Sequence, residues 1–197
     1  MVSPFYKKKL LLENENIYLQ TLGIEDITDE YVNGLNDLEV NRFLVDVRRN
    51  IQTHQSVETF VLSNLDDSNS ILFGIFLKKN PVSFVGTVHI SKINFFHYTA
   101  SIGICLFSKK NWKKGYAFQS VILIKDYLFN TCGLHHLEAG VFAKNHKSIS
   151  MFKRAGFFEG YRVSNKYRHV TSFEDVIFFC AINNSFDLRV LKQKAEC

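Results

Sequence analysis

The chain has 197 residues, of which 46% are hydrophobic, 14% aromatic and 22% charged. This composition supports a folded core and contains no run near the ~18 apolar residues that cross a bilayer, which excludes a disordered or membrane-spanning protein. The net charge of +5 is compatible with nucleic acid, anionic lipid or a polyphosphate cofactor as a partner, and selects none of them.

A single domain over residues 1–197 is predicted, because the length fits one core and neither a repeat nor a proline-rich linker interrupts the chain. Lys7–Lys9 precede only three consecutive apolar residues, too few for the core of a signal peptide. The four cysteines show neither CxxC spacing nor a histidine at zinc-ligand spacing. We therefore expect a cytoplasmic protein with reduced thiols and no metal.

The first third of the chain is predicted to form one strand and two helices. Ile17–Leu22 alternates in polarity, which is typical of a strand. Ile24–Leu35 carries apolar residues at helical spacing, with Asp26 and Thr28 as candidate caps near its start. Thr53–Leu65 follows as a second helix, whose first residue can cap it.

The middle of the chain changes to strands. Ser70–Lys78 and Val82–Ile93 are rich in β-branched and aromatic residues, and the break between them predicts a hairpin. Ala100–Phe107 follows as the fourth predicted strand of the chain. Gly115–Asn130 then places apolar residues at 4-3-4 spacing, the pattern of a buried helix face, and Gly133 follows as its stop.

The last third alternates again between strands and a helix. We predict a strand at Leu137–Phe142, a helix at Asn145–Ala155, strands at Phe157–Tyr167 and Phe173–Ile182, and a short helical or frayed tail at Leu188–Cys197. Strand–helix–strand connections require local parallel pairing, because the helix must cross over. The element order therefore predicts an α/β fold, a mixed sheet of about seven strands flanked by about four helices.

The segment Ser108–Ala117, with the sequence SKKNWKKGYA, joins a predicted strand to a predicted helix. The start of a helix offers unpaired backbone amides and the positive end of the helix dipole, which together bind phosphate. Gly115 lets the backbone approach an anion closely, and Lys110, Lys113 and Lys114 add positive charge. The segment predicts an anion site, with a solvated basic loop as the alternative.

Two ordered motifs resemble those of the GNAT acetyltransferase superfamily. Gly115 and Ala117 match the last two small positions of its Gln/Arg-x-x-Gly-x-Gly/Ala acetyl-CoA motif. Asn145-x-x-Ser148-x-x-x-Phe152-x-x-x-Gly156-Phe157 is similar to its Asn-x-x-Ser/Ala…Tyr/Phe…Gly-Phe motif, one helix and one strand later. Stretches at 35–43 and 173–176 resemble the ribosomal-protein N-terminal acetyltransferase branch, so that the resemblance covers about residues 15–184.

The resemblance implies a GNAT fold with acetyl-CoA in a V-shaped gap between the fourth and fifth predicted strands. It also implies that a backbone N–H of the fourth strand polarises the thioester carbonyl, an oxyanion-type stabilisation. The cofactor contacts that it implies are Ile104, Cys105, Leu106, Phe107, Trp112, Lys113, Lys114, Gly115, Tyr116, Ala117, Asn145, Ser148 and Phe152. The Asn145 side chain can bond the pantetheine amides, cap its helix, or do both.

The acid and base positions depart from the usual family pattern. Phe152 stands where many relatives carry a tyrosine acid, so Ser148, one helical turn earlier on the same face, is the candidate acid; its alternative role is to support the helix start.

Ser101 stands where many relatives carry a glutamate base. His89 is then the preferred base because histidine titrates near neutrality, and a structural histidine is the alternative. An amine that arrives deprotonated needs no base. Further candidates for the base are His97, Tyr98, Tyr167 and Asp175.

The resemblance thus predicts an acetyl-CoA-dependent N-acetyltransferase that transfers acetyl to a primary amine by direct attack. Our first hypothesis for the acceptor is a small molecule such as a nucleotide-linked amino sugar, because residues 145–147 resemble one amino-sugar branch. The alternatives are a protein N-terminal acetyltransferase and a non-catalytic acyl-CoA-binding module. The expected partners are acetyl-CoA and an amine, without nucleic acid or membrane, and a homodimer is left open.

Overall fold

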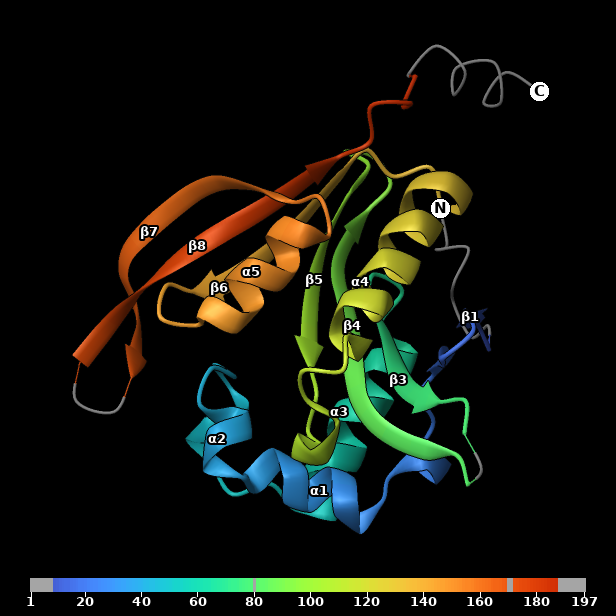
Figure 1. Cartoon of the computed structure of the whole chain (residues 1–197), viewed down its shortest axis with the longest axis vertical. Coiled ribbons are helices and arrows are strands. Elements are labelled where there is room, and N and C mark those ends of the chain that lie inside the picture. Colours follow the sequence, from blue (N-terminus) through green and yellow to red (C-terminus); the bar gives the residue numbers. More distant parts are fainter. Residues whose placement is uncertain (1–8, 80, 170–171, 188–197) are drawn as a thin grey trace.

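A computed structural model describes residues 9–79, 81–169 and 172–187, and the predicted tail at 188–197 lies outside them. The described chain forms one mixed sheet of eight strands in the order β1-β2-β3-β4-β5-β6-β8-β7 (Figure 1). The strands are β1 (Leu11–Glu13), β2 (Ile17–Thr21), β3 (Ile71–Leu77), β4 (Ser83–Asn94), β5 (Thr99–Cys105), β6 (His136–Phe142), β7 (Phe158–His169) and β8 (Ser172–Ile182).

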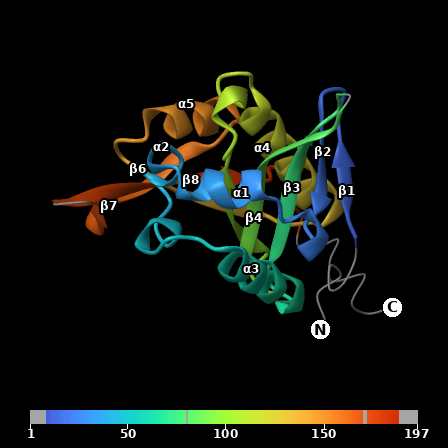
Figure 2. The same ribbon diagram turned by 90° about the horizontal axis from the view of Figure 1, so that it is seen from below.

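Helices cover both faces of this sheet. In Figure 2, α4 and α5 lie on one side of the sheet and α3 lies on the other, with α1 and α2 at the end nearest the viewer. The α-helices are α1 (Asp29–Asn36), α2 (Leu38–Asn41), α3 (His54–Asp66), α4 (Tyr116–Asp126) and α5 (His146–Arg154). Short turns add η1 (Ile24–Asp26), η2 (Val47–Arg49), η3 (Lys109–Asn111) and the π-helical η4 (Tyr127–Thr131).

The predicted α/β sheet is confirmed, with local differences from the predicted elements. The structure adds the short strand β1, which pairs with β2. The helix predicted over Ile24–Leu35 is divided into η1 and α1, because Thr28 between them has extended backbone and its hydroxyl accepts a hydrogen bond from the Tyr31 N–H. A residue that caps a helix in this way begins a new helix and cannot continue an old one.

The helix predicted over Gly115–Asn130 also has different ends. Gly115 precedes α4 as its N-cap, and the last turn of the prediction is the π-helical η4. Gly133 follows with a φ of +68°, a left-handed conformation that glycine adopts without steric cost and that stops the helix as predicted.

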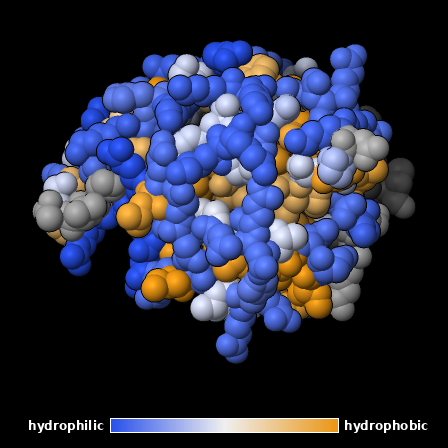
Figure 3. All heavy atoms as spheres, turned by 60° about the horizontal axis from the view of Figure 1, so that its bottom comes forward, coloured by the Kyte–Doolittle hydropathy of each residue, from blue (hydrophilic) through white to orange (hydrophobic). Residues whose placement is uncertain are grey.

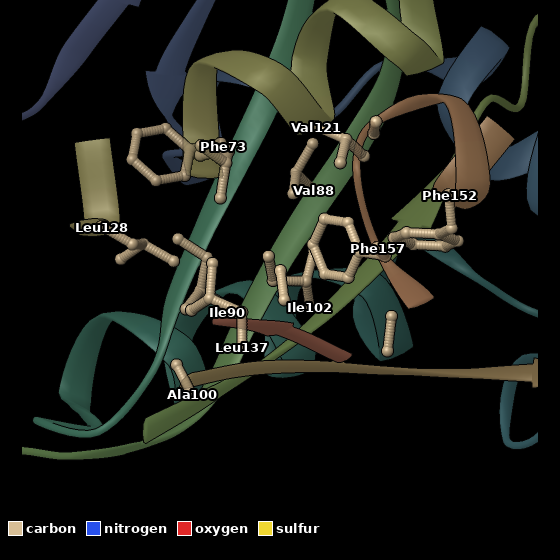
Figure 4. Close-up of a cluster of buried hydrophobic side chains, with 14 of the residues drawn as sticks. Phe73, Val88, Ile90, Ala100, Ile102, Val121, Leu128, Leu137, Phe152 and Phe157 are labelled. Atoms are coloured by element: carbon tan, nitrogen blue, oxygen red, sulfur yellow. The ribbon is translucent and has the colours of Figure 1, made fainter. Parts of the chain in front are cut away.

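Two clusters of apolar side chains form the core, one on each face of the sheet. The larger cluster lies under α4 and α5, where Val121 of α4, Leu128 of η4 and Phe152 of α5 meet Ile90 and Ile102 of the sheet (Figure 4). Each fully buried side chain of this kind stabilises the fold by roughly 1.5–3 kcal/mol. The smaller cluster packs α1 and α3 against the opposite face. Its members are Leu22, Tyr31, Val32, Leu35, Val57, Val61, Leu72, Phe76 and Phe107.

The strands β5 and β6 run parallel and are paired over only three positions, Thr99–His136, Ala100–Leu137 and Ser101–Glu138. Beyond the last pair they separate, as Figure 1 shows where β6 leaves β5 toward the left. We call the diverging segments, residues 102–105 of β5 and 139–142 of β6, the fork. The parallel pair is the one predicted from the strand–helix–strand order, since α4 is its crossover. No helix in the described residues is long and apolar enough to cross a membrane.

Candidate active site

The start of α4 has the geometry of an anion site. Gly115 is the N-cap, with a φ of +82° and no side chain to bond the helix start. The amides of the first turn therefore point out of the helix end, where the dipole favours negative charge. A Cβ added at Gly115 would meet only Gln119 Nε2, 3.8 Å away, so the surface above this residue is open to a ligand.

The four lysines before α4 divide into two pairs. Lys109 Nζ lies 2.7 Å from Asp37 Oδ2, and Lys110 Nζ lies 2.9 Å from Glu30 Oε1, so this pair is neutralised on the side of α1 and α2. The side chains of Lys113 and Lys114 are exposed beside the start of α4. Lys113 and Lys114 therefore remain the candidates for the predicted positive charge at the anion site, with Lys114 Nζ 3.4 Å from Asn111 Oδ1, because Lys110 is engaged elsewhere.

Trp112 connects the two sequence motifs in space. Its Nε1 donates a hydrogen bond to the Leu106 carbonyl at 2.7 Å, which fixes the ring at the end of β5. Lys147, at the start of α5, places its Nζ 4.8 Å from the centre of this ring. Residues that are 35 positions apart in the sequence thus lie side by side, and the helix starts of α4 and α5 border the same region.

The start of α5 carries the polar groups of the second motif. Asn145 Oδ1 accepts a hydrogen bond from the Ser148 N–H at 3.2 Å, so Asn145 caps the helix and keeps its amide nitrogen as a donor. The Ser148 side chain is half-buried. Phe152, one turn later, is buried against Phe157 and Phe179 at ring distances of 5.2 and 6.3 Å. Its ring serves the core, and Ser148 is the hydroxyl on this face.

The fourth predicted strand ends differently from the prediction. It stops at Cys105, and the Phe107 side chain is buried under α1 against Tyr31 at 4.9 Å. Burial raises the pKa of the Cys105 thiol to about 12, which keeps it protonated and unreactive near neutrality. Since β5 pairs with β4 only on one side along the fork, alternate backbone N–H groups of Ile102–Cys105 face β6 without a strand partner there.

His89 is held in a network of its own. Its Nε2 lies 2.9 Å from Ser70 Oγ, and its ring packs edge-on against Phe60 of α3 at 5.6 Å. Burial lowers its pKa. His89 pairs with Gly103 and so stands one strand away from the fork. Its role as a base stays a prediction, and these contacts are those of a structural histidine.

The other predicted bases lie in different places. Asp175 accepts hydrogen bonds from the Asn165 N–H and Arg162 Nε, both at 2.9 Å, and these bonds lower its pKa. It thereby fixes an irregularity in β7. His97 and Tyr98 belong to the turn before β5, beyond the paired end of the fork. Tyr167 alone lies near the fork, with its ring 5.7 Å from Phe142.

Sequence reasoning missed a cluster of rings and cations on the face of β6 opposite α5. Phe142, at the end of β6, lies 5.7 Å from Phe43 and from Tyr167. Arg48 of η2 stacks on Phe142 at 5.1 Å and donates to the Arg42 carbonyl at 2.9 Å and to the Arg168 carbonyl. We name this set the aromatic–cation cluster, and its members are Arg42, Phe43, Arg48, Phe142, Lys166 and Tyr167.

No local motif signals this cluster, because its members come from three distant segments. It lies where α2, η2 and β7 meet the open end of the fork. Figure 3 brings the lower end of the molecule in Figure 1 forward and shows hydrophobic residues set among hydrophilic ones on this surface.

A carboxylate also lies at the paired end of the fork. Glu138 of β6 is half-buried, and its Oε2 accepts a hydrogen bond from the Tyr161 hydroxyl at 2.9 Å. Tyr161 in turn stacks on Phe178 with ring centres 4.5 Å apart. The part of the chain that the structure describes contains no group of three or more His, Cys, Asp or Glu side chains able to hold a metal ion.

Comparisons with known sequences identify a family. The model described as an acetyltransferase (GNAT) domain matches residues 16–158. The probable N-acetyltransferase YjcK of Bacillus subtilis is 35% identical over 94 residues, which are 47% of this chain and 51% of that protein. The chain thus spans about half the length of the curated relative that it matches.

Solved structures share the fold at low sequence identity. Spermidine N-acetyltransferase from Vibrio cholerae, in complex with CoA and spermine, superposes with a TM-score of 0.78 at 18% identity, over 88% of this chain and 99% of that one. Ribosomal-protein-S5-alanine acetyltransferase from Vibrio fischeri gives 0.75 at 20% identity, over 90% and 99%. A GNAT-family acetyltransferase from Bacillus anthracis gives 0.75 at 18%, over 89% and 100%.

Proposed function

The chain belongs to the GNAT acetyltransferase family, and we propose that it transfers acetyl from acetyl-CoA to the primary amine of a nucleotide-linked amino sugar. The observation that carries the proposal is the contact of Lys147 with Trp112, because it brings the anion site at α4 beside the polar start of α5. Both then border the fork, where a thioester can meet an amine.

The residues around the fork fit the parts of acetyl-CoA. The amides of Tyr116, Ala117 and Phe118 would hold the pyrophosphate, and Lys113 and Lys114 would add charge. The Asn145 amide nitrogen would donate to a pantetheine carbonyl, while its oxygen continues to cap α5. The acetyl group would then lie at the fork, among the backbone N–H groups of β5.

The chemistry needs few side chains. As the amine attacks the thioester carbonyl, a β5 N–H that faces the fork stabilises the negative charge that develops on the oxygen. The Ser148 hydroxyl is the group on α5 that supplies a proton to the departing sulfur. A covalent acetyl-cysteine is not required, and the raised pKa of the half-buried Cys105 thiol keeps it protonated and unable to attack.

The aromatic–cation cluster supports an anionic acceptor that carries an aromatic group. The guanidinium groups of Arg42 and Arg48 lie 5.0 and 5.1 Å from the centres of the rings on which they stack. The nucleobase of an acceptor can therefore stack beside cations that bind its phosphates. Glu174, an acidic residue beside the cluster, is paired with Lys144 at 2.9 Å. A polycation such as spermidine would meet repulsion there.

Release of CoA thiol in the presence of acetyl-CoA tests the proposal on four acceptors. These are UDP-glucosamine, glucosamine, spermidine and a peptide with a free N-terminal alanine. We expect kcat/KM for UDP-glucosamine to exceed that for glucosamine by at least about tenfold, because only UDP-glucosamine carries the phosphates and the nucleobase. A preference for the peptide would favour a protein N-terminal acetyltransferase, and CoA binding without any turnover a non-catalytic module; either result contradicts the proposal.

A further inference from the structure

We propose that Glu138 is the general base that takes the proton from the acceptor amine, an assignment that rests on the proposed function. Glu138 is the direct partner of Ser101 in the last pair before β5 and β6 separate. Ser101 is the position on β5 at which the family resemblance places a glutamate that this chain lacks. The carboxylate is therefore present at the fork, on the neighbouring strand.

The two paired residues project from the same face of the sheet. Ile102 and Ala139, which follow them, belong to the core under α4 and α5. Because side chains alternate along a strand, Ser101 and Glu138 face the other way, toward the side on which the aromatic–cation cluster lies. Neighbouring strands lie roughly 4.8 Å apart, a distance that a glutamate side chain spans.

The space beside the Glu138 carboxylate is open toward the fork. The next residues on the same face are Gly103 of β5 and Gly140 of β6, and both are exposed. A Cβ added at Gly103 would meet only the His89 carbonyl oxygen, at 3.9 Å, whereas one added at Gly140 would meet the Phe178 ring at 3.3 Å, so the space is widest above Gly103. An amine above these two glycines would lie between the thioester in the fork and Glu138, within reach of the carboxylate directly or through one water.

Tyr161 holds the base in place. Its hydroxyl donates to Glu138 Oε2 at 2.9 Å, and its ring stacks on Phe178, so one carboxylate oxygen is fixed while the other is left for the amine. Burial and the bond to Glu138 raise the pKa of Tyr161, which keeps the phenol a donor. The other titratable side chains on this face of the strands include His136 of β6, His89 of β4, Cys105 of β5 and Cys180 of β8. The arginines and the lysine of the aromatic–cation cluster lie on the same side.

The step balances without another reactant. The nitrogen lone pair forms the C–N bond, the C–S bond breaks, and the sulfur leaves with its electron pair as a thiolate. The protonated amine loses two protons: the first passes to Glu138 before the attack and is later returned to solvent, and the second passes to Ser148 or water after the attack. Ser148 or water protonates the thiolate.

Glu138→Gln tests the assignment, with the acceptor of highest turnover among the four named above. We expect kcat to fall about 100-fold at pH 7 while the Kd for CoA is unchanged. The loss should shrink as the pH rises, because an amine that is already deprotonated needs no base. Glu159→Gln, which removes the same charge from an exposed position on β7, is the matched control and should retain full activity.

Two more variants separate a base from a structural carboxylate. Tyr161→Phe removes the hydrogen bond to Glu138 but keeps the carboxylate, so it should cost less than about tenfold. Ser101→Glu in the Glu138→Gln background returns a carboxylate to the opposite strand and should restore at least about tenfold of the loss. An equal loss in Tyr161→Phe, or a loss in Glu138→Gln that does not vary with pH, would overturn the assignment.

The outcomes distinguish this inference from the proposed function. An active wild-type enzyme with an equally active Glu138→Gln variant overturns the base alone. A wild-type protein that binds CoA and acetylates none of the four acceptors overturns the proposed function, and the base assignment falls with it.

Discussion

The two halves of the candidate site are built in different ways. The cofactor half, which consists of the loop 108–115 and the starts of α4 and α5, relies on backbone amides and on residues that are close in sequence. The acceptor half, which consists of Glu138, the fork glycines and the aromatic–cation cluster, relies on side chains from distant strands and turns. A helix start can be read from a short motif, whereas a cluster assembled by strand register cannot.

The largest expected effect tests the cofactor half. Gly115→Asp should weaken CoA binding by at least about 100-fold, because it places a carboxylate against the phosphates, and like charges in contact cost several kcal/mol. Titration calorimetry with CoA measures the change. Gly133→Asp is the matched control: its φ of +68° imposes similar backbone strain at the other end of the helical segment, and a Cβ there meets no atom within 4 Å. Equal affinities in the two variants would refute the anion site.

The second effect concerns the chemistry between the halves. Ser148→Ala should lower kcat about 100-fold and leave CoA affinity intact, as expected for the loss of a general acid. The variant keeps the Ser148 backbone N–H that Asn145 caps, so helix α5 is preserved. Ser150→Ala, on the exposed side of α5, is the control. Unchanged turnover in Ser148→Ala would contradict the role of Ser148 as general acid. The residue would then serve only to support the start of α5.

A third prediction compares the two lysine pairs of one loop. Replacing Lys113 and Lys114 by Gln should weaken CoA binding about tenfold at low salt, since two exposed charges contribute up to about 1 kcal/mol each. The difference should diminish at high ionic strength. The same change at Lys109 and Lys110, whose partners are on α1 and α2, should leave CoA affinity unchanged. Equal losses in both double variants would mean that the charge acts only as a general field.

The smallest effect is expected on the acceptor half. Arg48→Met should raise KM for UDP-glucosamine about five- to tenfold, because it removes a cation beside Phe142, while CoA affinity stays constant. Arg49→Met removes an exposed arginine that pairs with Asp46, and it serves as the control. Steady-state kinetics with each substrate varied separately measure both constants. A rise in the Kd for CoA instead would place Arg48 in the cofactor half.

The difference between local motifs and contacts made by the assembled sheet explains which parts of the fold and the candidate site the sequence predicts. Gly115, Asn145 and the apolar spacing of α4 are local signals. Within the described residues the predicted strands and helices exist with shifted boundaries, and the helix predicted over Ile24–Leu35 is divided in two at Thr28. The direction of a lysine is not local: Lys110 turns to Glu30, which is 80 positions away. The pairing of Ser101 with Glu138 depends on a register that only the assembled sheet defines.

The acceptor half was missed for the same reason. Phe43, Phe142 and Tyr167 follow no common spacing. The pKa of histidine favours His89 as the predicted base, but its Nε2 contacts Ser70. A lone glutamate in a strand has no distinguishing pattern, so the sequence does not single out Glu138. Its position becomes visible only from the pairing of β5 with β6.

The crystal structure of the complex with CoA tests the central claim most directly. We predict that the pyrophosphate oxygens lie about 2.7–3.2 Å from the amide nitrogens at the start of α4, and that the thiol ends in the fork between β5 and β6. A CoA molecule whose pyrophosphate lies away from residues 115–118, or whose thiol points away from the fork, would contradict the account.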